Sequence, residues 1–224
     1  MYSPFDGRAS QAVSQATHQR VPTNGWRVFA KSRASNALTA GTGNRELIPL
    51  SDSVLFDHLV GKRTIGVYPL LADDTCNFLA VDFDEAEWRD DALAFRQSCD
   101  ELGVPVALEI SRSGNGAHIW IFFSGRVSAR DARRLGTAII SHTCARTRQL
   151  KLASYNRLFP NQDTMPKGGF GNLIALPLQK HPRENGCSVF VDAGVLCHET
   201  INYLVPQHVT GFHKKYQETF IQWR

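Results

Sequence analysis

Two aspartates, Asp82 and Asp84, stand one residue apart near the end of a largely apolar stretch, residues 77–85. In an extended strand alternate side chains share a face, so both carboxylates are expected to point the same way. The opposite face carries the residues that would anchor the strand in a core: Leu79, Val81 and Phe83. Paired hard oxygen ligands suit a divalent cation such as Mg²⁺ or Mn²⁺. In the alternative interpretation, Asp84 caps the next helix and Asp82 lies at the surface.

A glycine-rich turn, Ser113-Gly-Asn-Gly-Ala-His118, forms a second candidate site. Glycines such as Gly114 let backbone N–H groups approach an anion closely, and Ser113 and His118 add side-chain donors. Arg112 adds a positive charge beside them. A triphosphate fits this arrangement, although the segment lacks the Gly-Lys-Ser/Thr ending of a Walker loop. The alternative is an ordinary hairpin turn followed by a core histidine with a structural partner.

A third stretch runs from Ser154 through the glycine-rich residues 167–171 into the apolar residues 172–179. Polar groups stand at its edges, from Asn172, Gln179 and Lys180. A structural loop is the default interpretation of such a segment.

The remaining patterns place these stretches on an α+β sheet. A helical period covers residues 88–102, and Ser128 to Asp131 reads as a capping box that opens a second helix. Strands are expected at 63–71, 104–110, 117–123, 173–178 and 188–192, and a short helix capped by Asp52 precedes the first of them. We expect strand 63–71 to form a hairpin with the strand of Asp82. The order predicts an RNA-recognition-like sheet with helices packed on one face.

The composition is ordinary for a soluble protein, but the charges are segregated along the chain. The chain has 224 residues, is 42% hydrophobic and carries a net charge of +4. Residues 70–101 hold ten acidic and two basic residues, whereas residues 126–157 hold eight basic residues and one acidic residue. This segregation suits a cation site in one place and a phosphate site in another. A solvated helix face explains the basic run equally well.

No apolar run approaches a membrane span and no signal pattern begins the chain, so we expect a cytoplasmic protein without membrane contact. Five cysteines without a C-x-x-C pair argue against a zinc ribbon or a disulfide framework.

In combination, the Asp-Phe-Asp strand, the Ser-Gly-Asn-Gly-Ala-His turn and the later Phe-Pro-Asn-Gln and Gly-Asn-Leu-Ile-Ala-Leu-Pro-Leu segments resemble the archaeo-eukaryotic primase superfamily. The resemblance is to the primase-polymerase domain of TOTE conflict systems, mobile-element-like loci that also encode a helicase and an endonuclease. It implies a primase-like fold whose sheet carries a metal site. The resemblance places a primase-polymerase domain at 46–192 and an atypical tail at 193–224, and the small polar residues and weak periodicity of residues 1–45 predict a poorly ordered segment there.

The resemblance also implies residue roles and partners. Divalent Mg²⁺ or Mn²⁺ would bind Asp82 and Asp84, which with His118 would serve catalysis. Nucleotide contacts would come from a set of five: Arg112, Ser113, Gly114, His118 and Lys180. The substrates would be nucleoside triphosphates and a nucleic acid template or primer, with the basic segment 126–157 as a candidate channel, and a helicase and an endonuclease of the same defence or conflict system would be partners.

One departure affects this expectation. The family's third acidic ligand would fall at Asn156, and asparagine is a neutral, weaker ligand. The third ligand is therefore left open among Asn156, Asp163 and Asp192. The competing function is a catalytically impaired, primase-like module that binds nucleic acid. A nucleotide-sugar glycosyltransferase is disfavoured because no Rossmann-like unit precedes Asp82, and a metal-dependent nuclease would need further acidic residues or a lysine near the pair.

Overall fold

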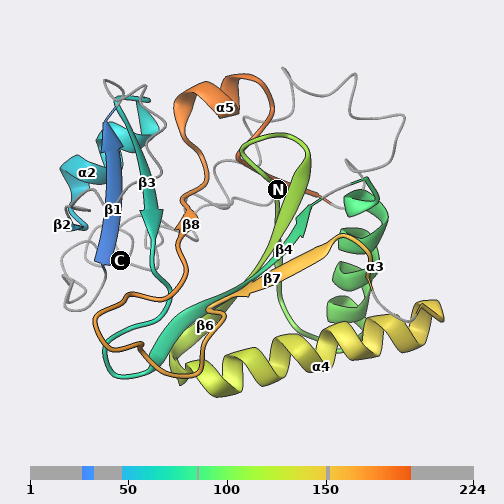
Figure 1. Cartoon of the computed structure of the whole chain (residues 1–224). Coiled ribbons are helices and arrows are strands. Elements are labelled where there is room, and N and C mark those ends of the chain that lie inside the picture. Colours follow the sequence, from blue (N-terminus) through green and yellow to red (C-terminus); the bar gives the residue numbers. More distant parts are fainter. Residues whose placement is uncertain (1–26, 33–46, 85, 150–151, 193–224) are drawn as a thin grey trace, which may run out of the picture.

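Two antiparallel sheets and four helices make up the part of the chain that the structure, a computed structural model, describes: residues 27–32, 47–84, 86–149 and 152–192 (Figure 1). The elements follow in the order β1 Arg27–Ser32, β2 Leu47–Pro49, α2 Asp52–Leu59, β3 Arg63–Val67, β4 Thr75–Asp84, α3 Trp88–Glu101, β5 Ala107–Ile110, β6 Gly116–Ser128, α4 Ala129–Thr147, β7 Tyr155–Phe159, β8 Ile174–Ala175, α5 Lys180–Glu184 and β9 Val189–Val191. The expected α+β class is confirmed. None of the described helices combines the length and apolarity that a membrane crossing requires.

The larger sheet has the strand order β7-β4-β6-β5-β9. Along the chain, four of these strands alternate with two helices in the order β4-α3-β5-β6-α4-β7. This order is the split βαβ arrangement of RNA-recognition-type domains. Strand β4 lies inside this sheet, with β6 on one edge and β7 on the other. Because β4 is hydrogen-bonded to a strand on each side, its backbone holds its side chains in fixed positions.

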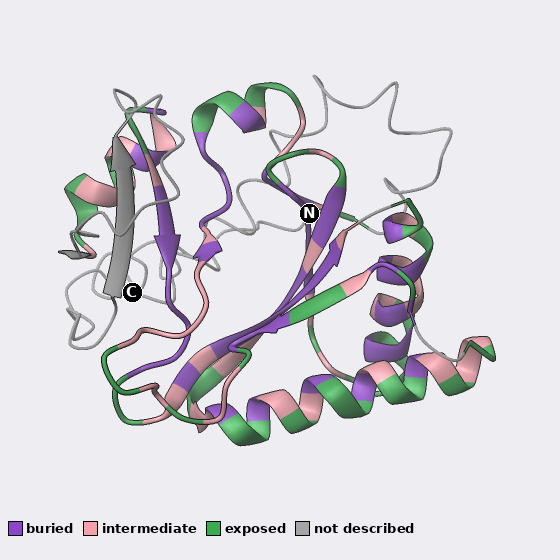
Figure 2. Cartoon of the chain, viewed as in Figure 1, coloured by how far each residue is buried: buried purple, intermediate pink, exposed green. Residues whose placement is uncertain are grey.

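Helices α3 and α4 cover one face of the larger sheet (Figures 1 and 2). Alternate residues of β4 enter the core on this face, including Leu79, Val81 and Phe83, which pack with Phe95 of α3 and Ile139 of α4. Helix α4 begins at the predicted capping box, since the Ser128 hydroxyl accepts a hydrogen bond from the backbone N–H of Asp131. Because side chains alternate along a strand, Asp82 and Asp84 must project from the other face.

The smaller sheet, of order β2-β1-β3-β8, packs toward that other face. A second apolar cluster joins the two sheets, with Ile65 and Val67 of β3 packed with Phe78 and Ala80 of β4 and with Trp120 of β6. The two carboxylates therefore continue, along β4, the row of residues that faces the smaller sheet.

Two expectations about local structure are wrong. Strand β3 does not form a hairpin with β4, because β6 and β7 already occupy both hydrogen-bonding edges of β4 and β3 pairs with β1 and β8 instead. The cap of α2 is the hydroxyl of Ser51, which accepts from the backbone N–H of Val54, and Asp52 is the first helical residue. Strand β1 falls within the expected poorly ordered segment 1–45, most of which, like 193–224, lies outside the described residues.

Candidate active site

A row of four charged or ionisable side chains crosses the larger sheet on the face turned away from α3 and α4. Cross-strand pairing aligns Arg157 of β7 with Asp82 of β4, Asp82 with His118 of β6, and His118 with Glu109 of β5. The predicted partners Asp82 and His118 are thus direct neighbours. Facing residues on one side of adjacent strands lie about 4.5–5.5 Å apart at Cβ, close enough for their side chains to interact.

Asp82 is 6% exposed and carries a cationic or ionisable group on each oxygen. His118 Nε2 lies 3.4 Å from Asp82 Oδ1, and Arg157 Nε lies 3.8 Å from Asp82 Oδ2. Both distances exceed those of ordinary charge-assisted hydrogen bonds, about 2.7–2.9 Å. The negative charge of Asp82 is therefore compensated on both oxygens, although neither contact is a short hydrogen bond.

Asp84 lies at the end of β4 and is held by neighbours on both sides. Asn156 Nδ2 donates a hydrogen bond to Asp84 Oδ2 at 3.1 Å. Gly116 faces Asp84 across the β4–β6 pair, and a Cβ at this position would stand 2.5 Å from Asp84 Oδ1 and 2.5 Å from the carbonyl oxygen of Phe83. The second glycine of the turn is thus needed because the Asp84 carboxylate passes directly over it.

The backbone that carries Asn156 is anchored by a buried aspartate on α3. Asp91 Oδ2 accepts hydrogen bonds from the backbone N–H and the hydroxyl of Ser154, at 2.9 and 2.8 Å. The carbonyl oxygen of Ser154 in turn accepts from the backbone N–H of Asp84 at 2.8 Å. Asp91 therefore fixes the start of β7 against the end of β4, and with it the distance between Asn156 and Asp84.

His118 is held on its second nitrogen by Glu109, a residue that the sequence interpretation missed. Glu109 Oε2 accepts from His118 Nδ1 at 3.1 Å and from Trp120 Nε1 at 2.7 Å. Burial alone would lower the pKa of His118, but the charge of Glu109 and hydrogen bonds to Asp82 and Glu109 outweigh it and raise the pKa to about 10. The available signal was a lone glutamate inside the short apolar strand β5, where a charge requires a partner.

The turn between β5 and β6 is organised by serine hydroxyls. Ser113 Oγ accepts from the backbone N–H of Asn115 at 3.2 Å and lies 3.0 Å from Ser111 Oγ. Gly114 adopts a φ of +79°, a conformation that side chains other than glycine rarely adopt. Ser113 itself is exposed, so its remaining hydrogen-bonding capacity faces solvent.

The two predicted basic nucleotide contacts, Arg112 and Lys180, belong to segments that both reach Thr64 of β3. Arg112 Nη1 donates to Thr64 Oγ1 at 2.9 Å, and Gln179 Nε2 donates to the same oxygen at 2.9 Å. Lys180 follows Gln179 directly and is exposed, with its Nζ 3.7 Å from Glu184 Oε1. Thr64 thus connects the glycine-rich turn to the start of α5, and Arg112 spans from the larger sheet to the smaller one.

Comparison with known proteins identifies the family. A family model described as "TOTE conflict system, Archaeo-Eukaryotic Primase domain" matches residues 6–209. The chain belongs to this family. The resemblance inferred from the motifs is thereby confirmed, and the match extends into the segments 1–45 and 193–224.

The comparisons with curated proteins and with solved structures do not add to this family assignment. No curated protein matches this chain. Among solved structures, the polymerase domain from Mycobacterium tuberculosis ligase D in complex with DNA is similar, with 16% identity, a TM-score of 0.37 and coverage of 70% of this chain and 50% of that chain. The primase-family chain therefore spans about half the length of that structure.

The three candidates for the family's third acidic position occupy different places. Asn156 lies beside Asp84, as described above. Asp163 forms ion pairs with Arg133 and Arg130 of α4. Asp192 follows β9, which is three strands from β4 in the sheet order, or about 14 Å at the usual spacing of about 4.8 Å. Asn156 is thus the candidate that this primase domain places in contact with the aspartate pair.

The donor set around Asp82 and Asp84 fits a divalent cation of the magnesium type. Mg²⁺ is commonly held by one or two carboxylates, with water and substrate phosphates completing the shell. Asp82 and Asp84 would supply the carboxylates, and rotation of the Asn156 amide, whose Oδ1 accepts from Arg157 Nε at 3.2 Å, would present a third oxygen. Among the described residues, no group of three or more His, Cys, Asp and Glu side chains has metal-binding geometry, and a cation held by the two carboxylates would take its other ligands from water or phosphate.

Most of the basic segment lies away from the aspartate pair. Helix α4, which carries Arg130, Arg133 and Arg134, covers the opposite face of the sheet, where a groove of about 510 Å³ is lined by these arginines and by Asp163. Arg157, by contrast, lies on β7 beside Asp82. The expected channel is therefore dispersed: Arg157 lies at the site, three arginines line the separate groove on α4, and Arg126 and Arg146 form ion pairs with Asp73 and Glu101.

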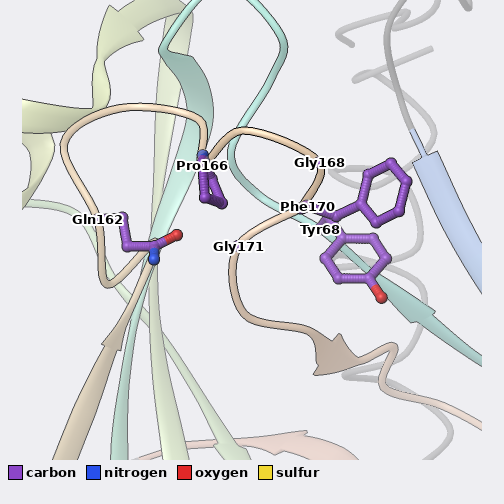
Figure 3. Close-up of a pocket in the computed structure, with 7 residues that line it drawn as sticks. Tyr68, Gln162, Pro166, Gly168, Phe170 and Gly171 are labelled. Carbon is purple, nitrogen blue, oxygen red and sulfur yellow. The ribbon is translucent and has the colours of Figure 1, made fainter. Parts of the chain in front are cut away.

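A further cavity, of about 380 Å³, lies in the third stretch of the sequence interpretation (Figure 3). It is lined by Tyr68, Gln162, Pro166, Gly168, Gly169, Phe170 and Gly171. The rings of Tyr68 and Phe170 pack with centroids 5.5 Å apart. None of the predicted site residues belongs to this lining.

Proposed function

We propose that this primase-family domain catalyses template-directed nucleotidyl transfer with divalent metal ions, as a DNA primase-polymerase of a mobile-element conflict or defence system. The observation that carries the proposal is the pairing of Asp82 with His118 across β4 and β6, with Asp84 two residues further on the same face. This arrangement places the metal-binding residue types beside the turn expected to bind phosphate. Family membership supports primase-like chemistry for that arrangement.

In this proposal Asp82 and Asp84 hold Mg²⁺ or Mn²⁺. The bound ions would neutralise the triphosphate and lower the pKa of the attacking hydroxyl of a primer or a first nucleotide. His118, oriented by Glu109, would donate from Nε2 to a phosphate oxygen. The backbone around Gly114, the hydroxyl of Ser113 and the charges of Arg112 and Lys180 would bind the rest of the triphosphate.

Charge balance favours weak occupancy by a second metal ion. In place of a third carboxylate, the domain has the neutral amide of Asn156, whose Nδ2 donates to Asp84, and the guanidinium of Arg157 beside Asp82. Both features reduce the negative charge available to two divalent ions. The same observation motivates the second candidate function, a catalytically impaired module that binds nucleic acid.

The nucleic acid template, the primer and the nucleoside triphosphates are partners in this proposal, and a helicase and an endonuclease of the same system are further ones. The proposed setting is cytoplasmic. Arg157 and the arginines of α4 would contact phosphates, so nucleic acid affinity should fall as salt concentration rises.

Incorporation of labelled nucleotide on a primed template with Mn²⁺ tests the function. We expect incorporation by the wild-type chain and its loss in Asp82→Ala/Asp84→Ala. A matched control is Asp100→Ala, which removes a carboxylate that is 63% exposed on α3 and should leave incorporation unchanged. A wild-type chain that binds the template without incorporating nucleotide would favour the impaired module.

A further inference from the structure

Glu109 is a buried carboxylate whose two hydrogen bonds converge on one oxygen. The residue is 2% exposed, and Oε2 accepts from both Trp120 Nε1 and His118 Nδ1. Burying a charge so deeply is unfavourable unless it is paired and hydrogen-bonded. The geometry therefore ties the position of Glu109 to one core residue and one residue of the candidate site.

Trp120, which donates a hydrogen bond to Glu109, is held in place by the core. Its side chain is 1% exposed and packs against Phe78, with ring centroids 5.1 Å apart, and against Phe122, with centroids 6.0 Å apart. A tryptophan packed in this way has a single position, so its Nε1 fixes the Glu109 carboxylate. The carboxylate then fixes Nδ1 of His118, and the imidazole ring must direct Nε2 toward Asp82, 3.4 Å away.

We propose that Glu109 is a positioning residue of the nucleotide site, which acts through His118 without touching the nucleotide. Without the carboxylate, the imidazole can turn about χ2, a torsion with broad, roughly two-fold preferences, and Nε2 leaves the place where a triphosphate oxygen would lie. This inference rests on the proposed function, because it assumes that His118 binds the triphosphate. It adds a residue from β5, a strand that contributes no other group to the site.

A double-mutant cycle on nucleotide binding tests the positioning role. The probe is a non-hydrolysable nucleoside triphosphate analogue with Mn²⁺. We expect Glu109→Leu to weaken binding about tenfold and Glu109→Gln, which keeps a carbonyl acceptor, to weaken it about threefold. Neither substitution should weaken binding further in a His118→Ala background, because residues that act through one group are not additive. An equal loss in both backgrounds would overturn the proposal.

Measurements on the folded state separate this role from simple support of the core. A purely structural Glu109 would lower the melting temperature of Glu109→Gln and leave affinity for the analogue at the wild-type value, which would also overturn the proposal. If the wild-type chain binds no triphosphate, the proposed function fails, and ¹⁵N spectra of the His118 imidazole then decide. We expect the Nδ1 resonance to shift in Glu109→Gln, and an unchanged resonance would refute the contact on which the inference depends.

Discussion

Replacing Asn156 by aspartate should make the protein less stable without metal and more active with it. The substitution removes the hydrogen bond from Asn156 Nδ2 to Asp84 Oδ2 and sets two negative oxygens about 3.1 Å apart. Their repulsion is about 5 kcal/mol at an effective dielectric constant of about 20 and about 1 kcal/mol in water. Since Asn156 is exposed, the lower figure applies. With about 1 kcal/mol for the lost hydrogen bond, and with Arg157 Nε, which donates to Asn156 Oδ1 at 3.2 Å, offsetting part of the repulsion, we expect destabilisation of at most about 2 kcal/mol.

The assay is thermal unfolding of wild type and Asn156→Asp, with EDTA and with Mn²⁺. A loss of about 2 kcal/mol corresponds to a melting temperature about 4–8 °C lower in EDTA for a chain of this size. A cation bound between three carboxylates removes the repulsion, so Mn²⁺ should raise the melting temperature of the variant more than that of wild type. Primer extension should also rise. An equal response of both proteins to Mn²⁺, with no gain in extension, would refute the reasoning.

Two further predictions concern the framework of the site. Gly116→Ala should lower the free energy of unfolding by about 1–3 kcal/mol, because its Cβ would overlap Asp84 Oδ1 and the carbonyl oxygen of Phe83. Nucleotide incorporation should fall with it, whereas Gly125→Ala, where no atom lies within 4 Å of the added Cβ, is the matched control. Asp91→Ala should cost about 2–3 kcal/mol in urea unfolding, because it leaves the buried Ser154 donors unpaired. It should also weaken Mn²⁺ binding, and retention of wild-type metal affinity would show that Asp91 does not position Asn156.

Local patterns predicted the elements that carry the aspartate pair. The apolar run that leads into Asp82 and Asp84 reflects burial on both faces of β4, and the helical period after Trp88 reflects packing of one face of α3, so both elements could be read from neighbouring residues. The pairing of β3 with β1 could not be predicted in this way. Its paired residues, such as Val28 and Val67, are far apart in the sequence, and both strands are short. Strand β8 is shorter than its apolar segment, since most of residues 172–179 pack as an irregular chain rather than pairing in a ladder.

The sequence predicted the site residues that belong to recognisable motifs. It did not predict the residue whose role depends on its buried contacts in the fold. Asp82, Asp84 and His118 come from motifs, and the place of Asn156 comes from the family resemblance. Glu109 has no motif, and its importance follows from a register that sets it opposite His118. Asp163 shows that residue type alone can mislead. Its carboxylate is a suitable metal ligand by type, but in the fold it forms ion pairs with Arg133 and Arg130.

The most direct test of the central claim is the location of Mn²⁺ by anomalous scattering in crystals of the wild-type protein grown with a non-hydrolysable nucleoside triphosphate. The account predicts an anomalous peak bonded to carboxylate oxygens of both Asp82 and Asp84, with a triphosphate oxygen in its coordination shell and another within hydrogen-bonding distance of His118 Nε2. A triphosphate bound elsewhere, or a Mn²⁺ ion that leaves the Asp82 and Asp84 carboxylates uncoordinated, would contradict it.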